Sequence, residues 1–276
     1  MVSPIKAALI DEAVRKDGFL GEGFDAVIQD CRKQHAEWFD LANSVNKFGM
    51  RLLWSLKPRK TSNQQLLVTI LYGRCLSAFQ TTILLAERGL VLEARYVLRA
   101  MLETTFALVA TARDADFCQR YVDDDEYRLL DLVKACLRLE PAMRSFHALD
   151  EQDLRKRKQD AEQNIKSRKL KPLKVKDVAD AASMLGHYET SYRLLSNTAH
   201  ASVRDLDYHI VATKDQADIE KLGWGPQTGK SADVIMQACD DVIISAYAVL
   251  QLFERPELNN AHAALHRRFE QLLGKL

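Results

Sequence analysis

The stretch Gln65–Leu85, QLLVTILYGRCLSAFQTTILL, decides the fold class of this chain. Its apolar side chains lie on most sides of a helix instead of along one stripe, which is typical of a helix at the centre of a bundle. Thr61-Ser-Asn-Gln offers N-cap residues just before it, and Gly89 can end it. We therefore predict a central helix that begins near this cap and runs to about Arg88.

Apolar residues recur with helical spacing on both sides of this segment. They predict helices over residues 21–48 (ended by Gly49), 90–112 and 114–139 (with Pro141 near its end). Further helices are expected over 178–185 (ended by Gly186), 187–202, 231–254 (capped by Ser231) and 258–275. The glycine-rich segment 203–230 reads as a long loop with a short hairpin around Tyr208–Val211. The sequence thus predicts an all-α bundle of about seven to nine helices, in one domain over residues 1–276.

The composition agrees with this fold and excludes several function classes. Among 276 residues there are only 11 Gly and 6 Pro, so turns are scarce. A net charge of +1 gives no global attraction to nucleic acid or to an acidic membrane. Five scattered cysteines fit reduced thiols, and the apolar stretch around 106–112 is too short to cross a bilayer. We expect a soluble cytoplasmic protein without membrane contact, and the scattered histidines predict neither a metal site nor a cofactor.

Residues 151–176 are the exception to this charge balance. They hold ten Lys or Arg against four Asp or Glu, a local net charge of +6, and predict a basic helical arm or insertion broken at Lys171-Pro172. Its basic side chains could bind nucleic-acid phosphates, although no aromatic residue is present for base stacking. The alternative is a solvated face. The candidate contacts are Arg155, Lys156, Arg157, Lys158, Arg168 and Lys169.

A polar helix face in the segment 189–200, ETSYRLLSNTAH, is the main candidate site. Arg193, Ser196, Asn197 and His200 fall at i, i+3, i+4 and i+7 and share one face of a helix. A His can transfer protons near neutral pH, and an Arg can hold a phosphate through planar donors. One His per chain supplies half of the proton transfers for RNA cleavage, so a symmetric dimer would complete the site. Alternatively, these side chains only satisfy buried polar groups; a Ser196/His200 nucleophile pair is the weakest alternative.

The predicted helix over 90–112 carries a second candidate. Arg99 and Glu103 lie four residues apart in an otherwise apolar segment, where charged side chains are seldom buried without a partner. The pair either closes within the helix against a neighbouring helix or contributes to a site. No Gly-rich phosphate loop accompanies it, because Gly223-Trp-Gly-Pro lacks the Lys and Ser or Thr of a P-loop.

Two segments resemble a known group of proteins. Arg95–Glu103 and Tyr192–His200 resemble a family of uncharacterised bacterial helical proteins that share Arg-x-x-x-Glu in one core helix and Tyr-x-x-x-Ser-x-x-x-His in a later one. The shared positions are Arg99, Glu103, Tyr192, Ser196 and His200. The resemblance spans about residues 60–255 and implies no assigned activity.

The second segment is also similar to the Arg-x(4–6)-His signature of the HEPN superfamily, with six residues between Arg193 and His200. Leu194 stands where that signature usually has a polar residue, and Asn197 comes later than its Asn. The resemblance implies a helical, often dimeric, metal-independent endoribonuclease of toxin–antitoxin or phage-defence systems, with RNA and an antitoxin or defence protein as partners. His200 would be the acid/base and Arg193 would hold the phosphate, while Ser196, Asn197 and Tyr192 orient them and Arg99 and Glu103 support them.

Two other functions stay open at this point. The chain could be a non-catalytic helical scaffold that binds a protein or RNA, with the Arg/Ser/His residues as buried structure. It could also bind a small molecule or nucleotide, with the segment 203–230 and its Trp224 as a lid.

Overall fold

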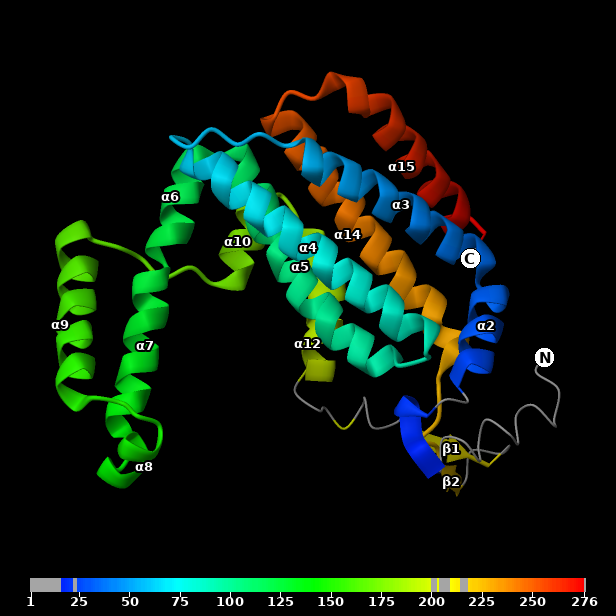
Figure 1. The fold of residues 1–276 in the computed structure, drawn as a ribbon, viewed down its shortest axis with the longest axis horizontal. Helices are drawn as coiled ribbons and strands as arrows, with labels where there is room; N and C mark the ends of the chain where they lie inside the picture. Colours follow the sequence, from blue (N-terminus) through cyan, green and yellow to red (C-terminus); the bar gives the residue numbers. More distant parts are fainter. Residues whose placement is uncertain (1–15, 22–23, 200–202, 204–208, 214–217, 276) are drawn as a thin grey trace.

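The computed structural model describes residues 16–21, 24–199, 203, 209–213 and 218–275 (Figure 1). These residues are mostly helical, with two short strands among them, which confirms the predicted all-α bundle. The helices are more numerous and shorter than predicted, because the segments 21–48 and 114–139 are each divided in two. His200 and Tyr208 lie outside the described residues.

The described elements, in chain order, are η1 (Gly18–Leu20), α2 (Phe24–Gln34), α3 (Ala36–Ser55), α4 (Asn63–Glu87), α5 (Val91–Arg113), α6 (Ala115–Asp123), α7 (Asp125–Arg138), α8 (Pro141–Phe146), α9 (Glu151–Arg168), α10 (Val175–Ala181), α11 (Leu185–His187), the π-helical turn η2 (Tyr188–Tyr192), α12 (Arg193–Ala199), β1 (Ile210–Ala212), β2 (Ile219–Leu222), η4 (Thr228–Lys230), α14 (Ser231–Leu252), η5 (Pro256–Leu258) and α15 (Asn259–Leu273).

The core lies where α3, α4, α5 and α14 pack together. Figure 1 shows α4 beside α5, with α3, α14 and α15 on one side of this pair. As predicted, α4 begins at a Ser62 cap, whose Oγ accepts a hydrogen bond from the Gln65 N–H at 3.3 Å, and the turn after it uses Gly89 at φ +70°. Large, fully buried side chains fill the space between these helices, among them Tyr72, Leu76, Phe79, Leu98, Met101 and Phe106.

The apolar stretch around residues 106–112 is not the segment that comes nearest to the length of a membrane span. Helix α4, with 25 residues and a mean hydropathy of 1.3 in its most apolar window, is long and apolar enough to cross a membrane by length and composition. Among the described helices it is the single one that meets this test. Its buried side chains pack against α5 and α14, as in the core helix of a bundle.

Three predicted helix boundaries differ because tertiary packing overrides local signals. Gly49 does not end a helix; it lies buried within α3, where an added Cβ would come within 2.6 Å of Leu76 Cδ2. Gly49 therefore allows α3 and α4 to approach closely. Ser231 does not cap α14 with its side chain, because its Oγ is buried and donates to the Ala86 carbonyl at 2.7 Å. The third difference, at Gly186, belongs to the candidate site.

Asp124 divides the predicted helix 114–139 into α6 and α7. Its buried carboxylate accepts hydrogen bonds from the Leu173 backbone N–H at 2.7 Å and from Arg128 Nε at 3.0 Å. Residues 124 and 173 are the two ends of the segment that contains α7, α8 and α9. Asp124 therefore joins the two ends of this segment. From here on, the arm means residues 124–173.

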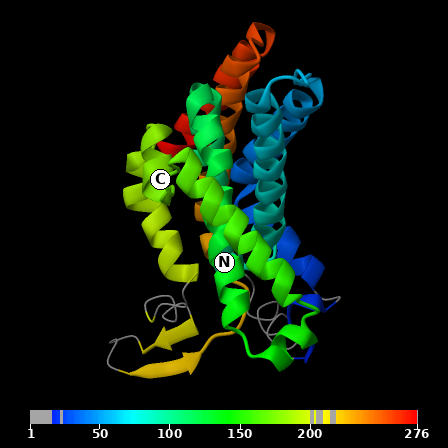
Figure 2. The same ribbon diagram turned by 90° about the vertical axis from the view of Figure 1, so that its left-hand side faces the viewer.

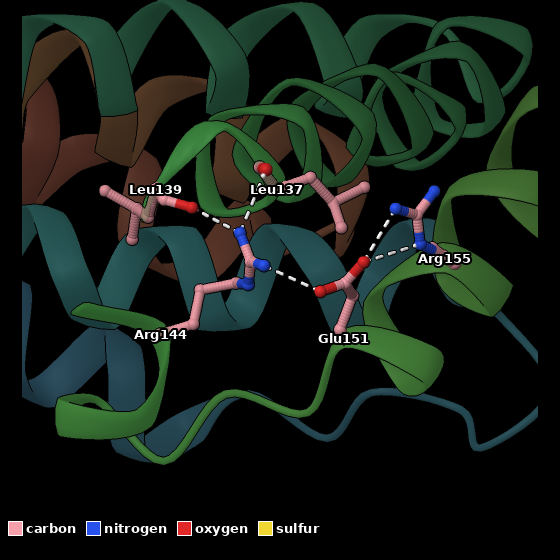
Figure 3. Close-up of polar contacts among 5 residues, drawn as sticks. All are labelled: Leu137, Leu139, Arg144, Glu151 and Arg155. Atoms are coloured by element: carbon pink, nitrogen blue, oxygen red, sulfur yellow. Dashed lines mark hydrogen bonds and ion pairs between the residues drawn. The ribbon is translucent and has the colours of Figure 1, made fainter. Parts of the chain in front are cut away.

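The arm extends to one side of the bundle, with α7 and α9 packed side by side (Figure 1). At its tip, Arg144 Nη1 donates to the Leu137 carbonyl at 3.3 Å and to the Leu139 carbonyl, so it caps the end of α7. Its Nη2 donates to Glu151 at 2.6 Å, and Arg155 donates to the same carboxylate at 2.6 Å (Figure 3). The predicted basic helix is thus confirmed, and it ends before Lys171-Pro172.

The segment 203–230 contains a hairpin, as predicted, whose first strand begins at Ile210. Strands β1 and β2 pair antiparallel, with Ile210 opposite Leu222 and an irregularity after Val211. Figures 1 and 2 place this hairpin beyond one end of the bundle. The chain then returns to the bundle, where the Gln227 N–H donates to the Gly89 carbonyl at 2.9 Å.

Candidate functional site

The site begins with a charged pair on α5. Arg99 Nη2 and Glu103 Oε1 lie 3.2 Å apart, one helical turn from each other. Their side chains are 27% and 36% exposed, so the pair lies at the edge of the core and is reached by solvent. The predicted intrahelical pair is present, and it closes against a second helix.

Tyr192 and Ser196 supply the contacts from that second helix. The Tyr192 hydroxyl donates to Glu103 Oε1 at 2.9 Å and accepts from Arg99 Nη2 at 2.9 Å. Arg99 Nε donates to Ser196 Oγ at 3.2 Å, and its Cζ lies 5.2 Å from the centre of the Tyr192 ring. The structure therefore brings together four of the five residues of the two sequence motifs. We call Arg99, Glu103, Tyr192 and Ser196 the Arg99 cluster.

A π-helical turn places Tyr192 and Ser196 against α5. The prediction that Gly186 ends a helix is wrong. The break between helices comes earlier, where Ser183 has a left-handed φ of +58°. Residues 188–192 then form the π turn η2, and the Tyr188 and Tyr192 rings stack with centroids 5.1 Å apart. Such turns shift the register between the residues before and after them and are frequent at functional sites. After the turn, the buried Leu195 anchors α12 in the core.

The Arg99 cluster combines a cation, a proton donor and a proton acceptor. Burial raises the pKa of the Tyr192 phenol above its usual value, and the hydrogen bond to Glu103 raises it further. Tyr192 therefore stays protonated near neutral pH and donates to the Glu103 carboxylate. The neighbouring guanidinium balances that carboxylate, so the cluster binds the two helices together without an uncompensated charge.

The other residues of the predicted face lie apart from this cluster. Arg193 is 62% exposed, forms an ion pair with Glu189 at 2.9 Å, and lies 5.9 Å from the centre of the Tyr188 ring. Asn197 is exposed. His200 directly follows the last residue of α12 and lies outside the described residues. The predicted four-residue face is thus divided, because Ser196 turns toward α5 while Arg193 faces solvent.

The predicted nucleic-acid contacts on the arm are mostly paired with carboxylates. Arg155 pairs with Glu151 at 2.6 Å, Arg157 with Asp153 at 2.7 Å and Lys158 with Glu162 at 3.8 Å. Arg168 pairs with Asp123, while Lys156 and Lys169 are exposed. Ion pairs within the arm neutralise part of its positive charge, which favours the solvated-face interpretation.

Sequence reasoning missed the residues around a cavity next to Glu103. This cavity of about 570 Å³ is also lined by Arg74 from α4, Tyr121 from α6 and Arg128 from α7. Burial raises the pKa of Tyr121. Arg74 was recognisable in the sequence as the one charged residue within the apolar segment Gln65–Leu85. The other two come from helices whose packing the sequence pattern does not specify.

No disulfide and no metal-ligand cluster is found in the described part of the chain. All five cysteines are free thiols. Over the same residues, no group of three or more His, Cys, Asp or Glu side chains is arranged to hold a metal ion.

Comparison with known protein families matches residues 65–218 to DUF5677, a family of unknown function. The chain belongs to this family. The matched span includes both sequence motifs and the entire Arg99 cluster, so the predicted membership in an uncharacterised family is confirmed. No curated protein and no solved structure matches the chain. The DUF5677 assignment carries no activity, and the HEPN resemblance stays a prediction.

We expect Tyr192→Phe to lower the free energy of unfolding by about 1 kcal/mol, because it removes two hydrogen bonds at a site that water can partly reach. Urea denaturation measures this change. Tyr96→Phe is the matched control, since Tyr96 lies on α5 with an exposed ring, and it should leave stability unchanged. Equal stability of Tyr192→Phe and wild type would show that the cluster does not hold α12 on α5.

Proposed function

We propose that this protein is a cytoplasmic, HEPN-like, metal-independent endoribonuclease. The observation that supports the proposal is the Arg99 cluster, because its hydrogen bonds to Tyr192 and Ser196 fix α12 on α5. This leaves Arg193 exposed on a helix with a defined orientation, and His200 comes seven residues later in the sequence. In this proposal Arg193 and His200 act on RNA, and the cluster residues position them.

The reaction needs an acid, a base and a cation. His200 removes the proton from a ribose 2′-hydroxyl, and the 2′ oxygen attacks the adjacent phosphorus. The P–O5′ bond breaks, and the 5′ oxygen takes a proton from an imidazolium, which a second copy of the chain would supply in a dimer. A 2′,3′-cyclic phosphate and a 5′-hydroxyl result. Arg193 binds the phosphate oxygens. The RNA phosphate therefore competes with Glu189 for the Arg193 guanidinium.

Cleavage of RNA in EDTA tests the proposal. We expect His200→Ala to reduce the rate by about 10²-fold or more, the usual loss with a general acid or base, and Arg193→Ala to reduce it similarly. The matched controls are His147→Ala at the tip of the arm and Arg267→Ala on α15, which are both exposed and should cleave like wild type. All variants should melt within a few degrees of one another.

The competing function is a non-catalytic helical scaffold for a protein or RNA. It is favoured by the Arg193–Glu189 ion pair at 2.9 Å, which engages Arg193 Nε within its own helix. Full cleavage by His200→Ala would refute the acid/base role of His200 and with it the proposed mechanism. Absence of cleavage by wild type, with a lowered melting temperature in the Arg193 and His200 variants, would instead establish the scaffold.

A further inference from the structure

A large cleft lies between the carboxyl-terminal part of α5, the turn from α10 to α11, and helices α14 and α15. Its volume is about 1040 Å³, and apolar side chains such as Val109, Met184, Ile244 and Leu252 form most of its lining. Ligand pockets for small molecules are typically ~300–1000 Å³ and mostly apolar, with a few polar groups that orient the ligand. The cleft therefore has the size and surface of a small-molecule site, and it does not involve the Arg99 cluster.

The charged groups of the cleft have one sign. Arg113 is the one permanently charged residue in the lining, which also includes His187, His262 and His266 and no Asp or Glu. Two carboxylates outside the lining contact its histidines, Asp240 at 3.3 Å from His187 and Glu270 at 3.8 Å from His266. Among its described lining residues the cleft therefore offers a cation for a negative charge and no carboxylate for a positive one.

Arg113 is placed to hold a carboxylate. Its Nη1 donates to the Ala182 carbonyl at 2.9 Å, which fixes the guanidinium at the edge of the cleft, while the side chain stays exposed. An Arg has five N–H donors in a planar fork, so donors remain for a second acceptor. A carboxylate matches this planar fork and can bind it through two parallel hydrogen bonds.

His262 extends the apolar wall at neutral pH. His262 Nε2 donates to the Ile243 carbonyl at 2.9 Å, and its ring lies 5.8 Å from the Tyr247 ring. Burial lowers the pKa of His262, so this ring is neutral near pH 7. Tyr247 is largely exposed at the cleft and offers an aromatic surface to an apolar ligand.

We propose that this cleft binds a small monocarboxylate with an extended apolar body. The carboxylate pairs with Arg113, and the apolar body lies between α14 and α15 beside Tyr247. This binding does not depend on RNA cleavage, so its test is separate from the test of the proposed ribonuclease.

Isothermal titration of the full chain with ten-carbon probes tests this proposal. Decanoate is expected to bind at one site per chain, and decyltrimethylammonium at least about 10-fold more weakly, because a hydrogen bond to a charged group typically contributes that factor or more. Arg113→Gln should weaken decanoate binding by about 10-fold or more for the same reason. Ala263→Trp, which fills the cleft from α15, should abolish binding.

Two matched variants separate the cleft from general surface effects. Ala264→Trp adds the same ring at the neighbouring, exposed position of α15, and Arg51→Gln removes an exposed arginine from α3. Both should bind decanoate like wild type. Absence of decanoate binding, equal binding of the two ions, or unchanged affinity in Arg113→Gln would each overturn the proposal. These three results do not require Ala263→Trp to fold.

Discussion

Asp241→Asn is expected to raise the free energy of unfolding by at least about 2 kcal/mol at pH 8, because keeping a carboxyl protonated above its unfolded pKa costs up to about 1.4 kcal/mol per pH unit and asparagine has no such cost. Asp241 lies on α14 and is 1% exposed. Neither of its carboxylate oxygens has a hydrogen-bond partner among the described residues. Burial raises the pKa of Asp241 well above its usual value, and the neighbouring Asp240 raises it further.

Among the described residues, no cation lowers the pKa of Asp241. The pKa of Cys75 is raised to about 12, mainly by burial and further by the nearby Asp241. The Cys75 thiol contacts Ser245 Oγ at 3.5 Å and Thr105 Oγ1 at 3.7 Å. The buried Tyr72 hydroxyl has no hydrogen-bond partner among the described residues. The interior of the α4, α5 and α14 packing is thus polar but neutral, which suits a protonated Asp241.

The sign of the pH dependence follows from the raised pKa. The folded state holds the Asp241 proton at pH values where the unfolded chain has lost it, so this carboxyl favours folding most at low pH. Stability should fall with a slope of up to about 1.4 kcal/mol per pH unit above the unfolded pKa, near 4, until the folded pKa is reached. The gain from Asp241→Asn should therefore be small at pH 4 and largest at pH 8.

Urea denaturation at pH 4, 6 and 8 measures this effect. Asp233→Asn is the matched control, because Asp233 is exposed on the same helix, and it should give no such gain. A variant Asp241→Asn that is less stable than wild type at pH 8 would mean that the carboxylate is ionised and has a partner in solution.

Gly89→Ala should lower the free energy of unfolding by about 2–4 kcal/mol, since a left-handed non-glycine residue costs ~1–2 kcal/mol and backbone crowding adds to it. Gly89 has φ +70°, and an added Cβ would lie 2.7 Å from the Gln227 nitrogen and 2.8 Å from Pro226 Cβ. The methyl group would therefore disturb the contact that joins the α4–α5 turn to the segment before α14.

Gly73→Ala is the matched control for this prediction. Gly73 lies within α4, and an added Cβ would meet nothing within 4 Å. Alanine there should increase stability by about 0.5–1 kcal/mol, because glycine weakens a helix interior. Urea denaturation of both variants at one pH gives the comparison. If both variants changed stability in the same direction, the close contact at Gly89 would not exist in solution.

The candidate site shows which parts of a site a sequence pattern can predict. The Arg99–Glu103 pair was predictable, because residues four apart on one helix are always neighbours. Tyr192 and Ser196 were recognised through a family resemblance, but nothing local indicated that they contact α5. The π turn at 188–192 precedes α12 and sets the register in which Ser196 meets Arg99. Arg74, Tyr121 and Arg128 converge from three helices, which no spacing rule reveals.

By itself, the sequence determined the helical class and the helices α4, α5, α14 and α15, since apolar periodicity, the Ser62 cap and Gly89 act within a few residues of the backbone. Tertiary structure alone decided where Gly49, Asp124 and Ser231 act. Gly49 leaves room for the Leu76 side chain, Asp124 accepts a hydrogen bond from Leu173, and Ser231 donates one to Ala86. Each residue thus acts through a partner from a distant segment. Such partners are fixed by the packing of whole helices, which local propensity does not encode.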